Sequence, residues 1–445
     1  MAKRKVDPMR AHELATQFLH KLNHSEDSPR LHHWAGEWWE YHETRWRRVP
    51  EPELLASILA WMIDEEITAK KVEAQCVLDV LQAITLSREV RTMPFWSPPI
   101  LAEEDGPWLN MENWLVNPER LASGDREGGV QQKTSRWFST VEVPYDYDPE
   151  ATCPTWDKWC EDMLPSPEAR DLIEEFFGYL LIPETLQHAA LFLVGDGGTG
   201  KSTVSVVAEA LLGSENCSSL SIQQLASEYG LNTTFGKMLN YIDETSHQIS
   251  AKEEMALKWY ISGRPLETNR KYLGYLKMRP TARLIVATNR FPEFKDPTDG
   301  IWRRIHSVKM DRKLGVDERD PRILATLQGE APGIFNRALL GLHRLREQGR
   351  FTVVENAALD AARDSLQSVK SFIEDYLCEK EDGFLCNGTI KDLYGSWCMA
   401  NGTKPSSTII ELSQSIMSKW PNVKRESRRI DATTKRGLQG IALVE

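Results

Sequence analysis

The sequence predicts an α/β fold whose core is a set of buried strands alternating with helices. Leu191 to Val194 is a short apolar run that leads into a glycine-rich loop, and a helical pattern follows from Val204 to Leu212. Two further apolar runs end in polar residues, one at Asp243 and one at Asn289. Strands that alternate with helices are typical of α/β proteins. These three runs therefore define the expected core.

The glycine-rich loop, Gly195-Asp-Gly-Gly-Thr-Gly-Lys-Ser202, fits the pattern of a phosphate-binding loop, with a strand before it and a helix after it. Its glycines let successive backbone N–H groups turn toward phosphates at the start of the helix. We expect Lys201 to reach the β- and γ-phosphates and Ser202 to ligate Mg²⁺. The predicted cofactors are therefore ATP and Mg²⁺. The predicted nucleotide-binding residues are Gly195, Asp196, Gly197, Gly198, Thr199, Gly200, Lys201, Ser202 and Thr203.

Polar residues at the ends of the other two strands would complete a hydrolytic site. We expect Asp243 to hold Mg²⁺ together with Ser202, and Glu244 to polarise the attacking water. Asn289 would bridge the γ-phosphate and that water. The alternatives are a solvated acidic loop and, for the arginine pair after Gly300, a surface salt bridge. The predicted catalytic residues are Lys201, Asp243, Glu244, Asn289, Arg303 and Arg304, one arginine acting on a neighbouring subunit.

A basic segment, residues 264–283, lies between the second and third strands. It contains six cations and one acid, Glu267, and aromatic residues occupy the middle, where a hairpin would turn. Cations that grip phosphates and rings that stack on bases suit contact with single-stranded DNA. A solvated hairpin is the alternative. The predicted DNA-binding residues are Arg270, Lys271, Tyr272, Tyr275 and Lys277.

The regions on either side of the core are expected to form separate domains. Residues 1–155 are predicted to be a mostly helical accessory and oligomerisation domain, residues 156–365 the ATPase core, and residues 366–445 a winged-helix domain. The last prediction rests on short helical patterns followed by a basic hairpin from Val423 to Leu443, with a turn at 434–437. The first region carries a tryptophan cluster in a predicted hairpin around Glu43-Thr44. It is interpreted either as a buried core or as a base-stacking surface, and its members are Trp34, Trp38, Trp39 and Trp46.

Composition excludes several classes of protein. The net charge of −11 argues against a surface coated in cations, although a local basic strip is enough to bind DNA. Seven scattered cysteines lack metal-site spacing, and no run of 18 apolar residues occurs. We therefore expect reduced thiols, no membrane partner, and a cytoplasmic location in a bacterial host cell or a virus-infected cell.

Taken in order, these residues resemble superfamily 3 helicases, specifically the helicase portion of phage and plasmid primases and the related poxvirus primase-helicase. The likeness rests on Gly195–Ser202, Tyr241–Glu244, Lys258 with Ser262–Lys271, Leu284–Pro292 and Gly300–Arg304. It extends upstream through Tyr145–Trp156 and Gly178–Leu181 and downstream through Val369–Phe372, Asp392–Trp397 and Arg436–Ile441, so it covers most of the chain.

The resemblance implies an AAA+ core and a ring, expected to be a hexamer, that moves 3′ to 5′ along single-stranded DNA. A separate primase or polymerase is a further expected partner, in a phage, prophage or plasmid-like element. The basic tail from Lys419 to Arg436, with seven cations and two acids, is interpreted either as a contact for duplex origin DNA or as a solvated wing. The chain departs from the family at Ser262-Gly-Arg264, where members commonly carry Ser-Gly-Asp. A second departure is that no room for a primase domain is expected ahead of residue 30. The alternative function is a DNA-binding AAA+ switch, an initiator or defence regulator, that assembles without unwinding.

Overall fold

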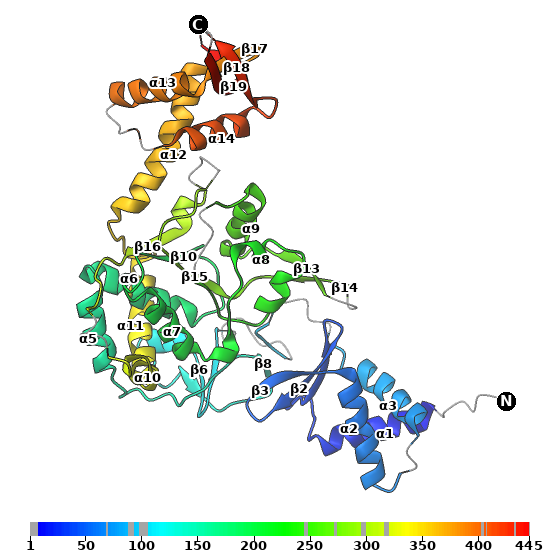
Figure 1. Ribbon diagram of the computed structural model, residues 1–445. Helices are drawn as coiled ribbons and strands as arrows, with labels where there is room; N and C mark the ends of the chain where they lie inside the picture. The colour runs from blue at the N-terminus through cyan, green and yellow to red at the C-terminus, as the bar shows by residue number, and fades with distance from the viewer. Residues whose placement is uncertain are drawn as a thin grey trace, which may run out of the picture.

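The structure is a computed structural model that describes residues 8–67, 70–87, 93–97, 106–243, 248–270, 274–294, 300–315, 320–401, 405, 407–430 and 433–444. A central α/β body carries an N-terminal region on one side. A C-terminal region, which begins with the long helix α12, lies on another side (Figure 1). Within the described part of the chain, no helix is long and apolar enough to cross a membrane.

The body is built on a five-stranded sheet in the order β11-β12-β15-β10-β16. Its members are β10 (Ala190–Val194), β11 (Cys217–Ser218), β12 (Leu239–Asp243), β15 (Arg283–Thr288) and β16 (Ile305–Lys309). Every pairing in it is parallel. The predicted α/β class and its three strands are thus confirmed. The order inserts β15 between β10 and β12, so the ends of the three predicted strands are neighbours.

Both faces of this sheet are covered, because alternate residues of β10 enter different hydrophobic clusters. Leu191 and Leu193 pack with α5 (Pro154–Met163), α6 (Pro167–Leu180), α7 (Lys201–Leu212), α10 (Ile323–Gly329) and α11 (Ala331–Gln348). Phe192 and Val194 pack against α8 (Ile222–Leu225) and α9 (Ala251–Ile261). Helix α6 begins as predicted, since the Ser166 hydroxyl accepts from the Ala169 N–H and Pro167 occupies the first turn.

The N-terminal region combines helices with an antiparallel sheet. Helices α1 (Pro8–Lys21), α2 (Glu51–Asp64) and α3 (Lys71–Ile84) share one hydrophobic cluster. The sheet consists of β1 (Leu31–Trp34), β2 (Glu37–His42) and β3 (Arg45–Val49) in that order. Its second hairpin turns at Glu43, which has a φ of 53°, so the predicted turn is confirmed.

Short strands between residues 95 and 143 join this region to the body. They are β4 (Phe95–Trp96), β5 (Leu109–Met111), β6 (Leu115–Val116), β7 (Val130–Gln131), β8 (Trp137–Phe138) and β9 (Glu142–Val143), with helix α4 (Pro118–Ala122) among them. Met111 and Val143 belong to the same hydrophobic cluster as α5 and α6. The packing is therefore continuous across residue 155, where the sequence predicts a boundary.

The C-terminal region has its own hydrophobic cluster, formed by α12 (Ala357–Tyr376), α13 (Asn387–Ala400), α14 (Ile409–Lys419) and a sheet. The sheet is antiparallel, in the order β17-β19-β18, from β17 (Leu377–Cys386), β18 (Lys424–Ile430) and β19 (Thr433–Leu443). The prediction of a turn at 434–437 was wrong, because those residues lie within β19 and pair with residues 426–429. Just before α12, the Asn356 amide donates to the Ser307 hydroxyl of β16 at 2.9 Å, in the interior.

Candidate nucleotide site

The glycine-rich loop connects β10 to α7, and its backbone explains its glycines. Gly198 and Gly200 have φ angles of 82° and 88°, a conformation that side chains disfavour. Gly195 lies against Met310, the residue after β16, where a Cβ atom would be 2.1 Å from the Met310 carbonyl oxygen. The loop therefore needs glycine for two reasons: to adopt its turn, and to pack closely against the backbone at Met310. This backbone fits a phosphate group at the start of α7.

Lys201, the first residue of α7, folds its side chain back into the loop. Its Nζ donates to the carbonyl oxygens of Gly195 and Asp196 at 2.5 and 2.7 Å, and to Asn289 Oδ1 at 3.3 Å. The ammonium group is thus held at the mouth of the loop by oxygen acceptors that phosphate oxygens can replace. The Asn289 contact joins the start of α7 to the residue that follows β15.

A pocket of about 720 Å³ opens above this edge of the sheet, large enough for a nucleotide. Among the residues that line it are Gly197–Thr203, Asp243 and Asn289. Gly195 and Asp196 line a neighbouring pocket that shares Thr199 and Asn289 with the first. The Asp196 carboxylate accepts from Lys313 Nζ at 2.9 Å, and this contact lowers the pKa of Asp196.

The residues fit a magnesium ion bound together with a nucleotide. Ser202 and Asp243 line the same pocket, and a hydroxyl with a carboxylate is the small protein share that Mg²⁺ usually takes beside phosphates. The described residues contain no group of three or more His, Cys, Asp or Glu side chains suited to a metal. Glu244, the predicted base, lies outside the described residues.

One end of the pocket is lined by residues that the sequence did not suggest. Trp159 and Met163 of α5 approach Gly200, where an added Cβ would lie 2.8 Å from the Trp159 ring. Leu314 and Ile323 line the pocket as well. These apolar side chains suit a nucleobase. Nothing in the local pattern around Trp159 distinguishes it from a core residue, because only tertiary packing brings α5 over the loop.

The two arginines after Gly300 differ in their surroundings. Both lie in the short 3₁₀ helix Trp302–Arg304. Arg304 is half-buried and donates from Nε to the Ser262 hydroxyl at 3.0 Å and from Nη1 to the Gly300 carbonyl oxygen. Burial, and then the charges of Arg303 and Arg264, lower the pKa of Arg304. Arg303 is exposed and has no side-chain partner within the described residues. Neither arginine is among the described residues that line the pocket of its own chain.

The basic segment forms the predicted hairpin, from β13 (Leu266–Arg270) and β14 (Gly274–Met278). Lys277 is exposed, whereas Lys271 and Tyr272, and the side chain of Tyr275, lie outside what the structure describes. The assignment of Arg270 as a DNA-facing cation needs correction. Its side chain is 8% exposed and pairs with Glu37 Oε2 of β2 at 3.0 Å, and it also donates to the Ala35 carbonyl oxygen.

The basic segment therefore presents less charge than its composition suggests. Arg283 is also buried. It lies over the Tyr179 ring at 4.4 Å and donates to the Ile182 carbonyl oxygen at 2.9 Å. Arg270 and Arg283, two of the six cations, thus stabilise the fold and are too buried to contact DNA.

The tryptophan cluster is a buried core and not a base-stacking surface. All four rings are at most 5% exposed. Trp34, Trp39 and Trp46 pack with Phe95 and Phe138 from the following region. Buried rings are unavailable for stacking on bases.

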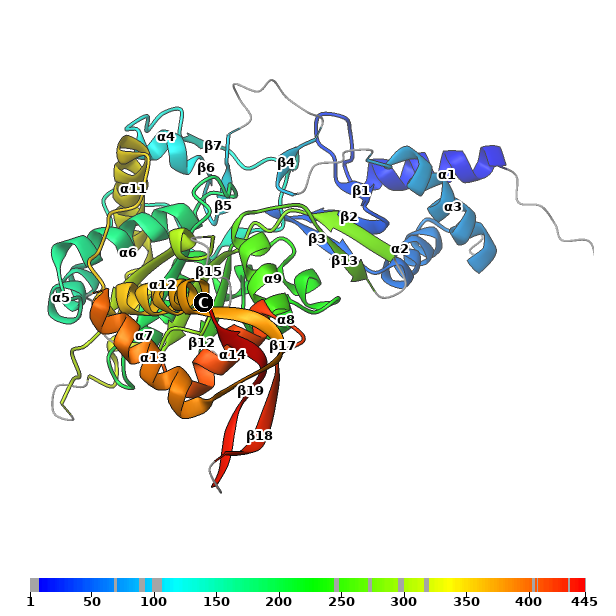
Figure 2. The ribbon, with the colours of Figure 1, turned by 90° about the horizontal axis from the view of Figure 1, so that it is seen from above.

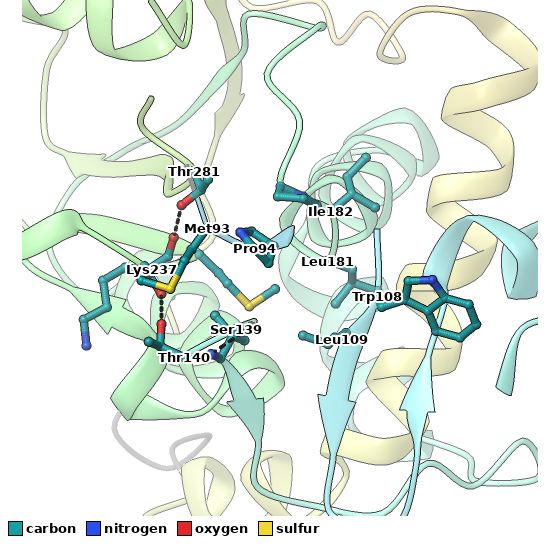
Figure 3. Close-up of a pocket in the computed structure, with 14 residues that line it drawn as sticks. Met93, Pro94, Trp108, Leu109, Ser139, Thr140, Leu181, Ile182, Lys237 and Thr281 are labelled. Carbon is teal, nitrogen blue, oxygen red and sulfur yellow. Dashed lines mark hydrogen bonds between the residues drawn. The ribbon is translucent and has the colours of Figure 1, made fainter. Parts of the chain in front are cut away.

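A separate small cavity lies where the joining region meets the body (Figure 3). Its walls are mostly apolar, with Met93 and Pro94 on one side and Trp108, Leu181 and Ile182 on the other. Its interior of about 30 Å³ is far too small for a nucleotide. We interpret it as a small packing defect between the joining region and the body, and we place the nucleotide in the larger pocket.

Residues 193–304 match a family described as a family of unknown function, DUF5906. A curated relative, the uncharacterized mitochondrial protein ymf21 of Marchantia polymorpha, is 28% identical over 118 residues. That alignment covers 24% of this chain and 66% of the relative, just under two thirds of its length.

Solved structures resemble the chain over nearly its whole length. The A form apo structure of the NrS-1 C-terminal region has a TM-score of 0.54, covering 98% of this chain and 100% of that one, at 11% identity. A second apo structure of that region has a TM-score of 0.52 at 13% identity, with the same coverage. At such identities the likeness shows the fold alone. The chain therefore has a fold similar to that of the NrS-1 C-terminal region.

Proposed function

We propose that the chain is an ATP-driven DNA helicase that forms a ring, expected to be a hexamer, and moves 3′ to 5′ along single-stranded DNA. The observation that carries the proposal is the juxtaposition of Lys201, Asp243 and Asn289 along one edge of the parallel sheet. A phosphate-binding lysine, a metal-binding carboxylate and a polar sensor are the parts that nucleotide hydrolysis in P-loop proteins needs.

The sheet order supports an AAA+ core, because the sensor strand β15 lies between the strands that carry Lys201 and Asp243. In this proposal, Lys201 and the loop N–H groups bind the phosphates, and Ser202 and Asp243 hold Mg²⁺. When bound, Mg²⁺ neutralises charge on the phosphate oxygens. Asn289 orients water, and Glu244 accepts its proton. Arg303, which is exposed, is the better candidate for the arginine that acts on a neighbour, because Arg304 is engaged internally.

Two exposed basic features are candidates for DNA contact. Lys277 is exposed on the β13–β14 hairpin. The β18–β19 ribbon extends away from the body (Figure 2), and the helices before it support a winged-helix domain. Its exposed cations, which suit the phosphates of duplex origin DNA, are Lys424, Arg425, Arg429, Lys435 and Arg436.

Strand displacement on a forked DNA substrate tests the proposal most directly. We expect ATP-dependent displacement by the unmodified chain, and loss of both ATP turnover and displacement in Lys201→Ala. Near-normal turnover in Lys201→Ala would refute the site. ATP turnover without displacement would instead favour a DNA-binding AAA+ switch of an initiator or defence regulator. The proposed setting is a phage, prophage or plasmid-like element, with a separate primase or polymerase as partner.

A further inference from the structure

Three segments that are distant in the sequence meet beside the arginine pair. Gly263 has a φ of 58°, and a Cβ there would lie 1.9 Å from the Thr185 hydroxyl oxygen. His188 donates its backbone N–H to the Thr185 carbonyl oxygen at 3.0 Å. The Arg304–Ser262 hydrogen bond joins the third segment. The loop 185–188, the turn 262–264 and the helix 302–304 thus form one surface, the cationic face.

The cationic face concentrates the positive charges of Arg264, Arg303 and Arg304. Arg264 and Arg303 are exposed, and within the described residues neither side chain forms an ion pair. Burial first, and then the charges of Arg304, Arg303 and Arg264, lower the pKa of His188. Cations gathered in this way repel one another, so the arrangement is unfavourable until an anion arrives.

Neither Arg264 nor Arg303 is among the described residues that line the same subunit's pocket, so we expect the anion to come from outside the subunit. Apolar side chains flank the cationic face. Leu186 is 75% exposed, and Trp259, whose carbonyl oxygen accepts from the Arg264 N–H, is 39% exposed. Exposed apolar residues around a charged centre suit a protein interface. A second copy of the chain supplies both an apolar partner and, with nucleotide bound, a polyphosphate.

We propose that Arg264 is a second cation, beside Arg303, that contacts the nucleotide phosphates held by a neighbouring copy of this chain. This proposal rests on the proposed ring ATPase. Arg304 acts differently: its bonds to Ser262 and Gly300 fix the turn and the helix relative to each other, so that Arg264 and Arg303 are presented together. Related helicases commonly carry an aspartate at the position of Arg264. In this chain the position would carry the opposite charge and would contact the phosphates directly.

The test begins with ATP turnover by Arg264→Ala and Arg264→Lys. We expect kcat to fall about 10- to 100-fold in the alanine variant and less in the lysine variant, which keeps the charge. Arg350→Ala, which removes another exposed arginine outside the cationic face, is the matched control and should leave turnover unchanged. Wild-type turnover in Arg264→Ala would overturn the proposal.

Mixing variants shows whether Arg264 acts across an interface. Lys201→Ala keeps its arginines and loses its own site, whereas Arg264→Ala keeps its site. In random rings, about a quarter of the interfaces pair an intact site with intact arginines, so the mixture should be several-fold more active than either variant alone. A mixture no more active than its components would overturn action in trans.

Further outcomes distinguish this proposal from two other roles for Arg264, DNA contact and assembly of the ring. If Arg264→Ala turns over ATP normally without DNA and loses only affinity for single-stranded DNA, the arginine is a DNA contact and the proposal fails. If its activity returns fully at high protein concentration, Arg264 serves assembly alone, and the proposal also fails. If the unmodified chain has no ATPase activity, the proposed function fails first.

Discussion

Arg270 offers the sharpest test of how the hairpin is used. The structure gives its guanidinium two acceptors in the N-terminal sheet, Glu37 Oε2 at 3.0 Å and the Ala35 carbonyl oxygen at 2.6 Å. We therefore expect Arg270→Ala to destabilise the junction between β13 and β2. The effect on DNA binding should follow only from that loss.

The expected cost follows from burial and from what remains after the change. The two side chains are only 8% and 11% exposed, and removing one partner of a buried pair costs about 3–5 kcal/mol. Glu37 keeps a second cation, because Arg48 Nε lies 2.7 Å from its other oxygen. The loss should therefore fall near the lower end, at about 3 kcal/mol.

The assay compares Arg270→Ala with Lys277→Ala, a change on the same hairpin at an exposed position. Urea unfolding gives the stability, and hydrogen exchange over residues 31–42 reports on the junction. Arg270→Ala should lower the unfolding midpoint and speed exchange there. Lys277→Ala should leave both unchanged and weaken binding to single-stranded DNA in a salt-dependent way. Unchanged stability in Arg270→Ala, with DNA binding lost, would refute the structural role.

Three further predictions concern the sheet and its site. Gly195→Ala should abolish ATP binding in a nucleotide titration, because its Cβ would lie 2.1 Å from the Met310 carbonyl oxygen; normal affinity would contradict the loop geometry. Asn289→Ala should lower kcat about 100- to 1000-fold with a smaller change in KM, and an unaltered kcat would exclude the sensor role. Burial lowers the pKa of His306 to about 4. Since the unfolded chain binds that proton near pH 6.5, stability is complete above about pH 6.5 and should fall by up to about 3 kcal/mol as the pH drops toward 4. His306→Leu should flatten this fall in urea unfolding at several pH values, and an unchanged slope would argue against His306.

Patterns that act over short distances predicted much of the fold. The glycine loop, the cap at Ser166 and the apolar runs before Asp243 and Asn289 each depend on neighbours within one strand or turn. Because the carboxyl ends of adjacent parallel strands meet, these patterns also predicted which side chains gather at the site.

What the sequence could not predict depends on contacts between distant segments. Arg270 is 233 residues from Glu37, and no local pattern shows that a cation in a basic hairpin is buried against an acid so far away. Trp159 looks like any core residue until α5 packs over Gly200. The β18–β19 turn was misplaced because Gly437, a typical turn residue, instead lies where β19 packs closely against Leu385 of β17.

Helix α12 connects the central sheet to the C-terminal region. Its base follows Asn356, which is bonded to Ser307 of β16, and β16 lies beside the strand that leads into the phosphate-binding loop. Twenty helical residues span about 30 Å, so a rotation of roughly 10° at the base would carry the far end about 5 Å. A rotation of the sheet that reached the base of α12 would therefore be enlarged at the basic β18–β19 ribbon.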